Sequence, residues 1–169
     1  MVIDQKIMQK SSRPFVRQER DLSLEKESLQ IDRISRQTKG GIRFRFRVLI
    51  LVKDKEKKSI SFAQAKGNDV ATAIRKATKQ AKKRLITYFI DTPRTIPYHI
   101  TNHFKATQIL LKPAPAGTGI IAGNTLNLVF KYLGVKDISA KVIGSTNKLN
   151  VVKCVFQALD KITGQKRSN

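Results

Sequence analysis

The chain has 169 residues, which is enough for one domain or two small ones. Hydrophobic residues make up 40% of it, which supports a packed core and argues against disorder along the whole chain. Its 34 Lys and Arg against 12 Asp and Glu give a net charge of +22, an excess that a polyanionic partner usually offsets. We expect that partner to be nucleic acid and not a membrane, because the sequence has no spanning apolar run and no basic amphipathic anchor.

The sequence offers little to a metal, a cofactor or a catalytic centre. Cys154 is the only cysteine, which excludes an internal disulfide and a cysteine-based zinc site. His99 and His103 have no Cys or carboxylate cluster beside them, and no Ser–His–acid set or carboxylate pair stands out. We therefore expect no metal, no cofactor and no enzymatic activity. The N-terminus lacks the apolar stretch of a secretory signal, and its acids argue against a transit peptide.

Residues 1–21 are expected to form a flexible tail, and residues 22–92 a first domain. Three strands are predicted, at 29–36, 43–52 and 59–65, with the sequence Thr-Lys-Gly-Gly at 38–41 turning the first into the second. A helix should follow, capped by Asn68 and ending before Pro93, because Val70, Ala73, Ile74, Ala77, Ala81 and Leu85 recur at helical spacing. The prediction is a three-stranded antiparallel sheet with one helix on its apolar face.

The second of these strands alternates in character. Phe44, Phe46, Val48, Ile50 and Val52 fall on one face, and Arg43, Arg45 and Arg47 fall on the other. Such a basic row is often an ordinary solvated face. Three arginines with no acid between them, beside Lys39, Gly40 and Gly41, instead favour contact with phosphates and bases.

Residues 93–163 are predicted to form a second domain, followed by a tail at 164–169. Its elements are expected in the order strand 96–102, strand 104–112, helix 120–133, strand 137–143 and helix 148–162. Gly134 and Gly164 are natural residues to end the two helices. The fold class is α+β, with a β-β-α-β-α second half.

Two loops of this half are candidates for binding. In residues 113–123 the glycines at 117, 119 and 123 are spaced one residue too far for a dinucleotide motif, with no acid about 20 residues on at a strand end and no Walker lysine. We favour a tight turn that packs on a neighbour over a phosphate cradle. In the segment Gly144–Asn147, Asn147 should cap the next helix, while Ser145 and Thr146 could contact phosphate or sugar.

Four segments occur in an order that is specific in combination: IDRISRQTKGGIRFRF (31–46), AKGNDVATAIRKATKQAKK (65–83), KPAPAGTGIIAG (112–123) and AKVIGSTNKLNVV (140–152). Over residues 22–162 the chain resembles the bacterial-type small-subunit ribosomal protein five family. The resemblance implies a first domain similar to a double-stranded-RNA-binding domain, and a second with a fold shared by some kinases and elongation-factor domains.

The resemblance also implies a function. The family binds small-subunit ribosomal RNA near where mRNA enters, contacts small-subunit proteins four and eight, and affects subunit assembly and decoding fidelity. Its hairpin loop, here about 36–42, reaches RNA near the head–body junction, and the interface with protein four lies largely on the second half. This chain departs from the family at Ser61, Ala63 and Ala65, where glycines are usual and where we expect each Cβ to hinder close RNA contact. Lys148 stands where proline is common.

Together, residues and resemblance nominate two sets of site residues. The RNA-binding set is Arg33, Arg36, Lys39, Gly40, Gly41, Arg43, Arg45, Arg47, Lys66, Ser145, Thr146 and Asn147. The set for a protein partner is Pro113, Gly117, Thr118 and Gly119.

Two rival functions remain open, a free regulatory protein that binds duplex RNA and a small-molecule kinase relic that uses residues 113–123. Abundant Ile, Lys and Asn with no Trp is typical of AT-rich genomes. This composition favours a plastid ribosome in the stroma, with the bacterial cytoplasm as the alternative.

Overall fold

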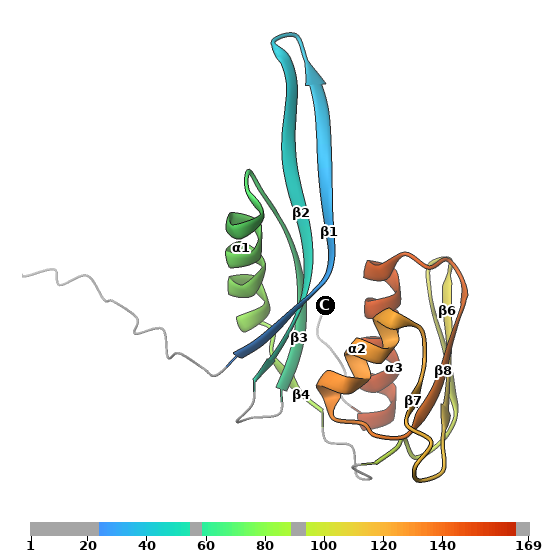
Figure 1. The fold of residues 1–169 in the computed structure, drawn as a ribbon. Coiled ribbons are helices and arrows are strands. Elements are labelled where there is room, and N and C mark those ends of the chain that lie inside the picture. Colours follow the sequence, from blue (N-terminus) through green and yellow to red (C-terminus); the bar gives the residue numbers. More distant parts are fainter. Residues whose placement is uncertain (1–23, 55–58, 89–93, 165–169) are drawn as a thin grey trace, which may run out of the picture.

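The computed structural model describes residues 24–54, 59–88 and 94–164. Within these ranges the chain forms two four-stranded sheets and three helices, so the α+β class is confirmed (Figure 1). The first sheet has the strand order β1-β2-β3-β4 and the second has the order β5-β6-β8-β7.

The first sheet is antiparallel throughout. Its elements are β1 (Leu24–Thr38), β2 (Gly41–Asp54), β3 (Ser59–Gly67), α1 (Val70–Lys82) and β4 (Ile86–Thr87). The three predicted strands and the turn at 38–41 are confirmed, although β1 and β2 are several residues longer than expected. The helix is shorter than expected, because Ile86 and Thr87 leave it to pair with β3. The predicted N-cap Asn68 is wrong by one residue: Asp69 holds that position, with extended backbone and no side-chain cap bond.

Strand β2 is buried on both faces along its second half. Val48, Ile50 and Val52 pack with Ala73, Ala77 and Ala81 of α1. Leu49 and Leu51, which point to the opposite face, are also fully buried. The predicted basic face therefore ends at Arg47, and beyond it the same face becomes core. The continuous apolar run from Val48 to Val52 is typical of a strand covered on both sides.

The second half contains β5 (Ile100–Phe104), β6 (Thr107–Pro113), β7 (Ile120–Ile121), α2 (Asn124–Leu133), β8 (Ile138–Gly144) and α3 (Lys148–Thr163). The predicted strand at 96–102 begins four residues later, and the helix predicted from 120 begins at Asn124 because Ile120 and Ile121 pair in parallel with β8. Three predicted helix ends are confirmed: Gly134 and Gly164 are left-handed C-caps, and the Asn147 side chain accepts a hydrogen bond from the Leu149 N–H.

The two halves share one hydrophobic core. Helix α1 covers one face of the first sheet, while α2 and α3 lie between its other face and the second sheet (Figure 1). Phe62 of β3 and Tyr88 make edge contacts with Phe156 of α3, at centroid distances of 4.8 and 5.9 Å. The Tyr88 hydroxyl donates to Asp160 at 2.7 Å. These contacts fix how the N-terminal sheet faces α3.

A β-bulge in β1 adds to this contact. The register of β1 against β2 shifts between Ser28 and Gln30, which leaves Leu29 as an extra residue. Its side chain is buried in the shared core, and its carbonyl oxygen accepts a hydrogen bond from Lys148 Nζ at 2.9 Å. Lys148 thus joins the two halves.

Candidate nucleic-acid interface

The β1–β2 hairpin extends well beyond the body of the molecule (Figure 1). Strand β3 pairs with β2 only as far as Phe46, opposite Gly67, so the hairpin continues past that point as a two-stranded ribbon. From Arg33 to Arg45 it carries five cationic side chains and no acid. At its tip Gly41 adopts a φ of 116°, a conformation that strongly favours glycine.

The strand register decides which basic residues lie together. Arg36 pairs with Arg43, Ile34 with Arg45, and Asp32 with Arg47. Lys66 of β3 pairs with Arg47. Because paired residues point to the same face and alternate residues share a face, one face collects the following basic residues, which we call the arginine face: Arg36, Arg43, Arg45, Arg47 and Lys66.

Arg33 lies on the opposite face, because it pairs with Phe46. The structure therefore divides the nominated RNA-binding residues of the hairpin between its two faces. The two central phenylalanines were predicted to lie on a core face. That prediction is wrong for Phe44, which is 45% exposed on the projecting ribbon, and Phe46 is half-buried.

Arg47 is held by an ion pair within the sheet. Its guanidinium donates from Nε and Nη2 to Asp32 Oδ2 at 3.0 and 2.8 Å, and Gln30 donates to Asp32 Oδ1 at 2.8 Å. The bond from Gln30 and the pairing with Arg47 lower the pKa of the Asp32 carboxyl. Arg47 is thus a structural member of the arginine face, at the boundary between the ribbon and the core.

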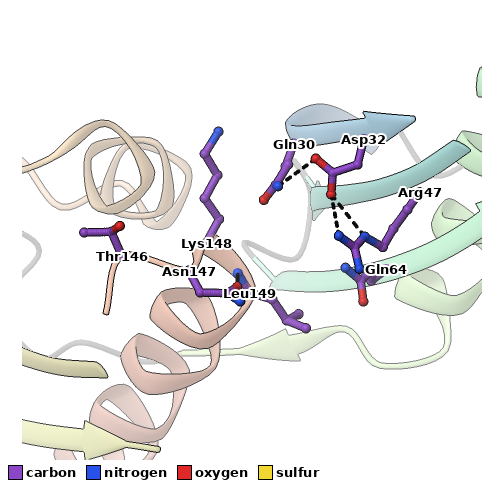
Figure 2. Close-up of a pocket in the computed structure, with 8 residues that line it drawn as sticks. All are labelled: Gln30, Asp32, Arg47, Gln64, Thr146, Asn147, Lys148 and Leu149. Atoms are coloured by element: carbon purple, nitrogen blue, oxygen red, sulfur yellow. Dashed lines mark hydrogen bonds and ion pairs between the residues drawn. The ribbon is translucent and has the colours of Figure 1, made fainter. Parts of the chain in front are cut away.

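A polar hollow of about 360 Å³ lies at the foot of this face, between the first sheet and the start of α3 (Figure 2). Its lining consists of Gln30, Asp32, Arg47, Gln64, Thr146, Asn147, Lys148 and Leu149. Arg47 therefore lines the same hollow as Thr146 and Asn147, which come about 100 residues later in the chain. The backbone of the neighbouring Ser145 is held by two hydrogen bonds: its N–H donates to the Ala106 carbonyl, and its carbonyl accepts from the Thr107 hydroxyl.

Ser61, Ala63 and Ala65, where the resemblance led us to expect glycines, lie away from this surface. Ser61, Ala63 and Ala65 are buried, and both alanines pack in the cluster with α1. The expectation that their Cβ atoms hinder RNA contact is wrong, because these side chains do not reach the surface.

The loop at 113–123 is fixed by a buried acid that the sequence analysis missed. Asp137, directly before β8, accepts hydrogen bonds on Oδ1 from the N–H groups of Gly117 and Gly119, at 3.0 and 2.9 Å. The two glycines have φ values of 92° and 74°, and a Cβ at either would meet no atom within 4 Å. They serve the turn conformation and not close packing within this chain. Asp137 stands 20 residues after Gly117, but it precedes β8 and does not end a strand, so the dinucleotide pattern did not include it.

The residues considered for a reactive thiol, a metal site or a membrane span show no such site in the described part of the chain. Burial raises the pKa of the Cys154 thiol, which lies in the core as predicted. Among the described residues there is no group of three His, Cys, Asp or Glu that could hold a metal ion. None of the described helices is long and apolar enough to cross a membrane.

A basic ribbon that projects from an α+β body indicates a protein of the nucleic-acid-binding class. Comparison with known proteins identifies the kind. The profile of Ribosomal protein S5, N-terminal domain, matches residues 24–87, and that of Ribosomal protein S5, C-terminal domain, matches residues 102–167. Relatives named small ribosomal subunit protein uS5 include those of Azorhizobium caulinodans (41% identity, 77% of its length), Bradyrhizobium diazoefficiens (41%, 72%) and Rhodopseudomonas palustris (40%, 74%), each aligned with 85% of this chain.

The chain belongs to the ribosomal protein S5 family. It is a structural, non-enzymatic constituent of the small ribosomal subunit and associates with ribosomal RNA there.

Proposed function

We propose that the chain binds small-subunit ribosomal RNA along one continuous surface, which runs from the hairpin tip down the arginine face to the hollow and the segment 145–147. The observation that carries the proposal is the register that aligns Arg36, Arg43 and Arg45 on one face of a ribbon. Arg36 and Arg43 are direct cross-strand neighbours, and such like-charged pairs are unfavourable until an anion joins them. A phosphate backbone supplies that anion.

Recognition on this face is mostly of RNA shape and backbone. Guanidinium groups bind phosphate oxygens in bidentate fashion, and folded RNA presents a regular array of phosphates. Lys39, Gly40 and Gly41 form a tip that is exposed, and a Cβ at either glycine would meet no atom of the chain within 4 Å. The tip is therefore narrow enough to approach RNA closely. Lys66, Ser145, Thr146 and Asn147 extend the contact to the body.

We propose that the loop with Pro113, Gly117, Thr118 and Gly119 contacts small-subunit protein four. The first three of these residues are exposed, and Asp137 fixes the loop from below. Because the carboxylate already accepts from two of the loop's N–H groups, these donors are not free to bind a phosphate. Saturable binding of ATP with magnesium, lost in Gly119→Arg, would contradict this assignment and favour a nucleotide site.

The finer placement also follows from the family resemblance. We propose contacts with small-subunit protein eight and a position near where mRNA enters, in support of assembly and decoding fidelity. We propose domain boundaries at 22–92 and 93–163, with tails at 1–21 and 164–169. The composition favours a plastid ribosome, whereas the relatives named above are bacterial. Detection of the chain in ribosomes isolated from plastid stroma or from bacterial cytoplasm separates the two locations.

The central test compares two triple variants that remove the same charge. Arg36→Gln, Arg43→Gln and Arg45→Gln clear the upper arginine face, while Arg75→Gln, Lys76→Gln and Lys79→Gln clear the exposed side of α1. Binding to small-subunit ribosomal RNA is measured at several salt concentrations, and co-sedimentation with small subunits on sucrose gradients. We expect the hairpin variant to lose at least about tenfold more affinity for the RNA than the α1 variant. A loss of this size corresponds to the removal of about one or two phosphate contacts. Equal losses would show that net charge, and not this face, directs binding.

A further inference from the structure

The face of the hairpin opposite the arginine face exposes large apolar side chains. Ile31 is 49% exposed, Ile42 58% and Phe44 45%. All three lie on one face, because Phe44 pairs with Ser35, Ile42 with Gln37 and Ile31 with Val48. Phe44 and Ile42 lie beyond the end of β3 pairing, on the part of the ribbon that projects from the body (Figure 1). Apolar side chains gathered in this way mark a contact surface.

Arg33 joins this apolar face. Its guanidinium carbon lies 3.8 Å from the centroid of the Phe44 ring, which is within the range of a cation–π contact. The contact places the guanidinium group of Arg33 over the ring of Phe44. Aromatic rings and arginine planes are the two surfaces on which unpaired RNA bases stack.

We propose that Arg33 and Phe44 form a stacking platform for an unpaired base of the RNA, an inference that rests on the proposed function above. The occupant must combine flat apolar groups with negative charge, because the ribbon carries five cations and no acid between Arg33 and Arg45. RNA meets both requirements. A fully paired duplex does not, since its bases are stacked inside and unavailable.

The two faces then bind different parts of the RNA. Arg36, Arg43 and Arg45 neutralise phosphates on one side of the ribbon, and Arg33 with Phe44 engages a base on the other. The ribbon is a single layer, so the two contacts are made on its opposite faces by residues that are close neighbours along the strands. The hairpin therefore enters a region where the RNA is folded on one side of the ribbon and has an unpaired base on the other side.

A fluorescence experiment tests the stacking directly. The chain has no Trp, so Phe44→Trp introduces a single reporter at the platform. The full-length variant is titrated with single-stranded polyuridylate and with heparin, a polyanion without bases, and its Trp fluorescence is recorded. Saturation with each polyanion is measured separately by electrophoretic mobility shift. We expect strong quenching with polyuridylate and little with heparin at equal saturation. Ile121→Trp, at another exposed apolar position, is the control and should respond weakly to both. Equal responses of Phe44→Trp to both polyanions would overturn the platform.

Affinity measurements separate this inference from the proposed function. Phe44→Leu keeps an apolar side chain but removes the ring, and should weaken binding to small-subunit ribosomal RNA by roughly tenfold without changing the salt slope. Phe44→Tyr keeps the ring and should bind like the wild type. If Phe44→Leu binds like the wild type while Arg36→Gln is weakened, the platform is wrong and the arginine face stands. If Phe44→Leu binds RNA normally but fails to join small subunits, a protein covers this face and the platform is again wrong. Failure of the wild type to bind would contradict the proposed function itself.

Discussion

The two ends of β2 are built from the same alternating backbone but have opposite surroundings. From Val48 to Val52 every side chain is buried, three of them beneath α1 and two against α2 and α3. From Ile42 to Arg45 every side chain is exposed on the ribbon. Arg47 and Phe46 lie between the two parts and are half-buried. The lower part anchors the ribbon, and the upper part presents it to a partner.

This difference separates stability from binding along a single strand. Burial at the lower end removes apolar surface from water and stabilises the fold. At the upper end the repulsion between neighbouring arginines lowers stability slightly in the free protein and is relieved on binding an anion. Substitutions at the two ends should therefore change different measured quantities.

The largest effect is expected at the buried end. Leu51→Ala should lower the free energy of unfolding by about 2–5 kcal/mol, because it leaves a cavity where β2 meets the helices of the second half. Chemical denaturation measures this loss. Binding of the folded variant to ribosomal RNA should stay close to that of the wild type. A selective loss of affinity with unchanged stability would show that the lower end also takes part in binding.

The next largest effect is expected at the exposed end of β2, where a substitution should change RNA binding and not stability. Arg43→Gln should weaken ribosomal RNA binding and reduce the slope of log affinity against log salt by about one, because one phosphate contact is lost. Its melting temperature should equal or exceed that of the wild type, since the repulsion with Arg36 is removed. Arg75→Gln on α1 is the matched control. A clear drop in melting temperature would mean that the arginine face supports the fold.

Much of this arrangement could be predicted from the sequence. The period-two pattern at 43–52 predicts a strand with unlike faces, and the same parity already separates Arg33 from Arg36. Alternation alone does not predict the burial of Leu49 and Leu51. The continuous apolar run at 48–52 indicates a strand covered on both sides, but which elements cover it depends on how α2 and α3 pack on the first sheet. The bulge at Leu29 and its bond to Lys148 likewise depend on contacts between residues more than 100 positions apart.

Lys148 tests whether the anchored end depends on the second half. Lys148→Met keeps most of the side chain's length and removes the hydrogen bond to the Leu29 carbonyl. We expect a loss of about 0.5–1.5 kcal/mol in the free energy of unfolding, the usual value of one such bond. Lys131→Met, at an exposed position of α2, is the control. If both variants unfold at the same denaturant concentration as the wild type, the bond to the bulge does not stabilise the junction.

The smallest effect is expected where the two ends of β2 meet, at the pair of Arg47 and Asp32. The pKa of Asp32 is lowered in the folded protein, first by the bond from Gln30 and then by Arg47. Since the folded protein favours the ionised carboxyl, the pair contributes its stability above the ordinary pKa of an aspartate, about 4, and loses it as the pH falls through the lowered value. Because both side chains are partly exposed, with 39% and 27% of their surface accessible, the contribution should stay below about 1 kcal/mol. Asp32→Asn should therefore melt slightly below the wild type at pH 7, and the difference should disappear in acid. A difference that persists at low pH would show that packing at this position, and not the charge on Asp32, holds the foot of the ribbon.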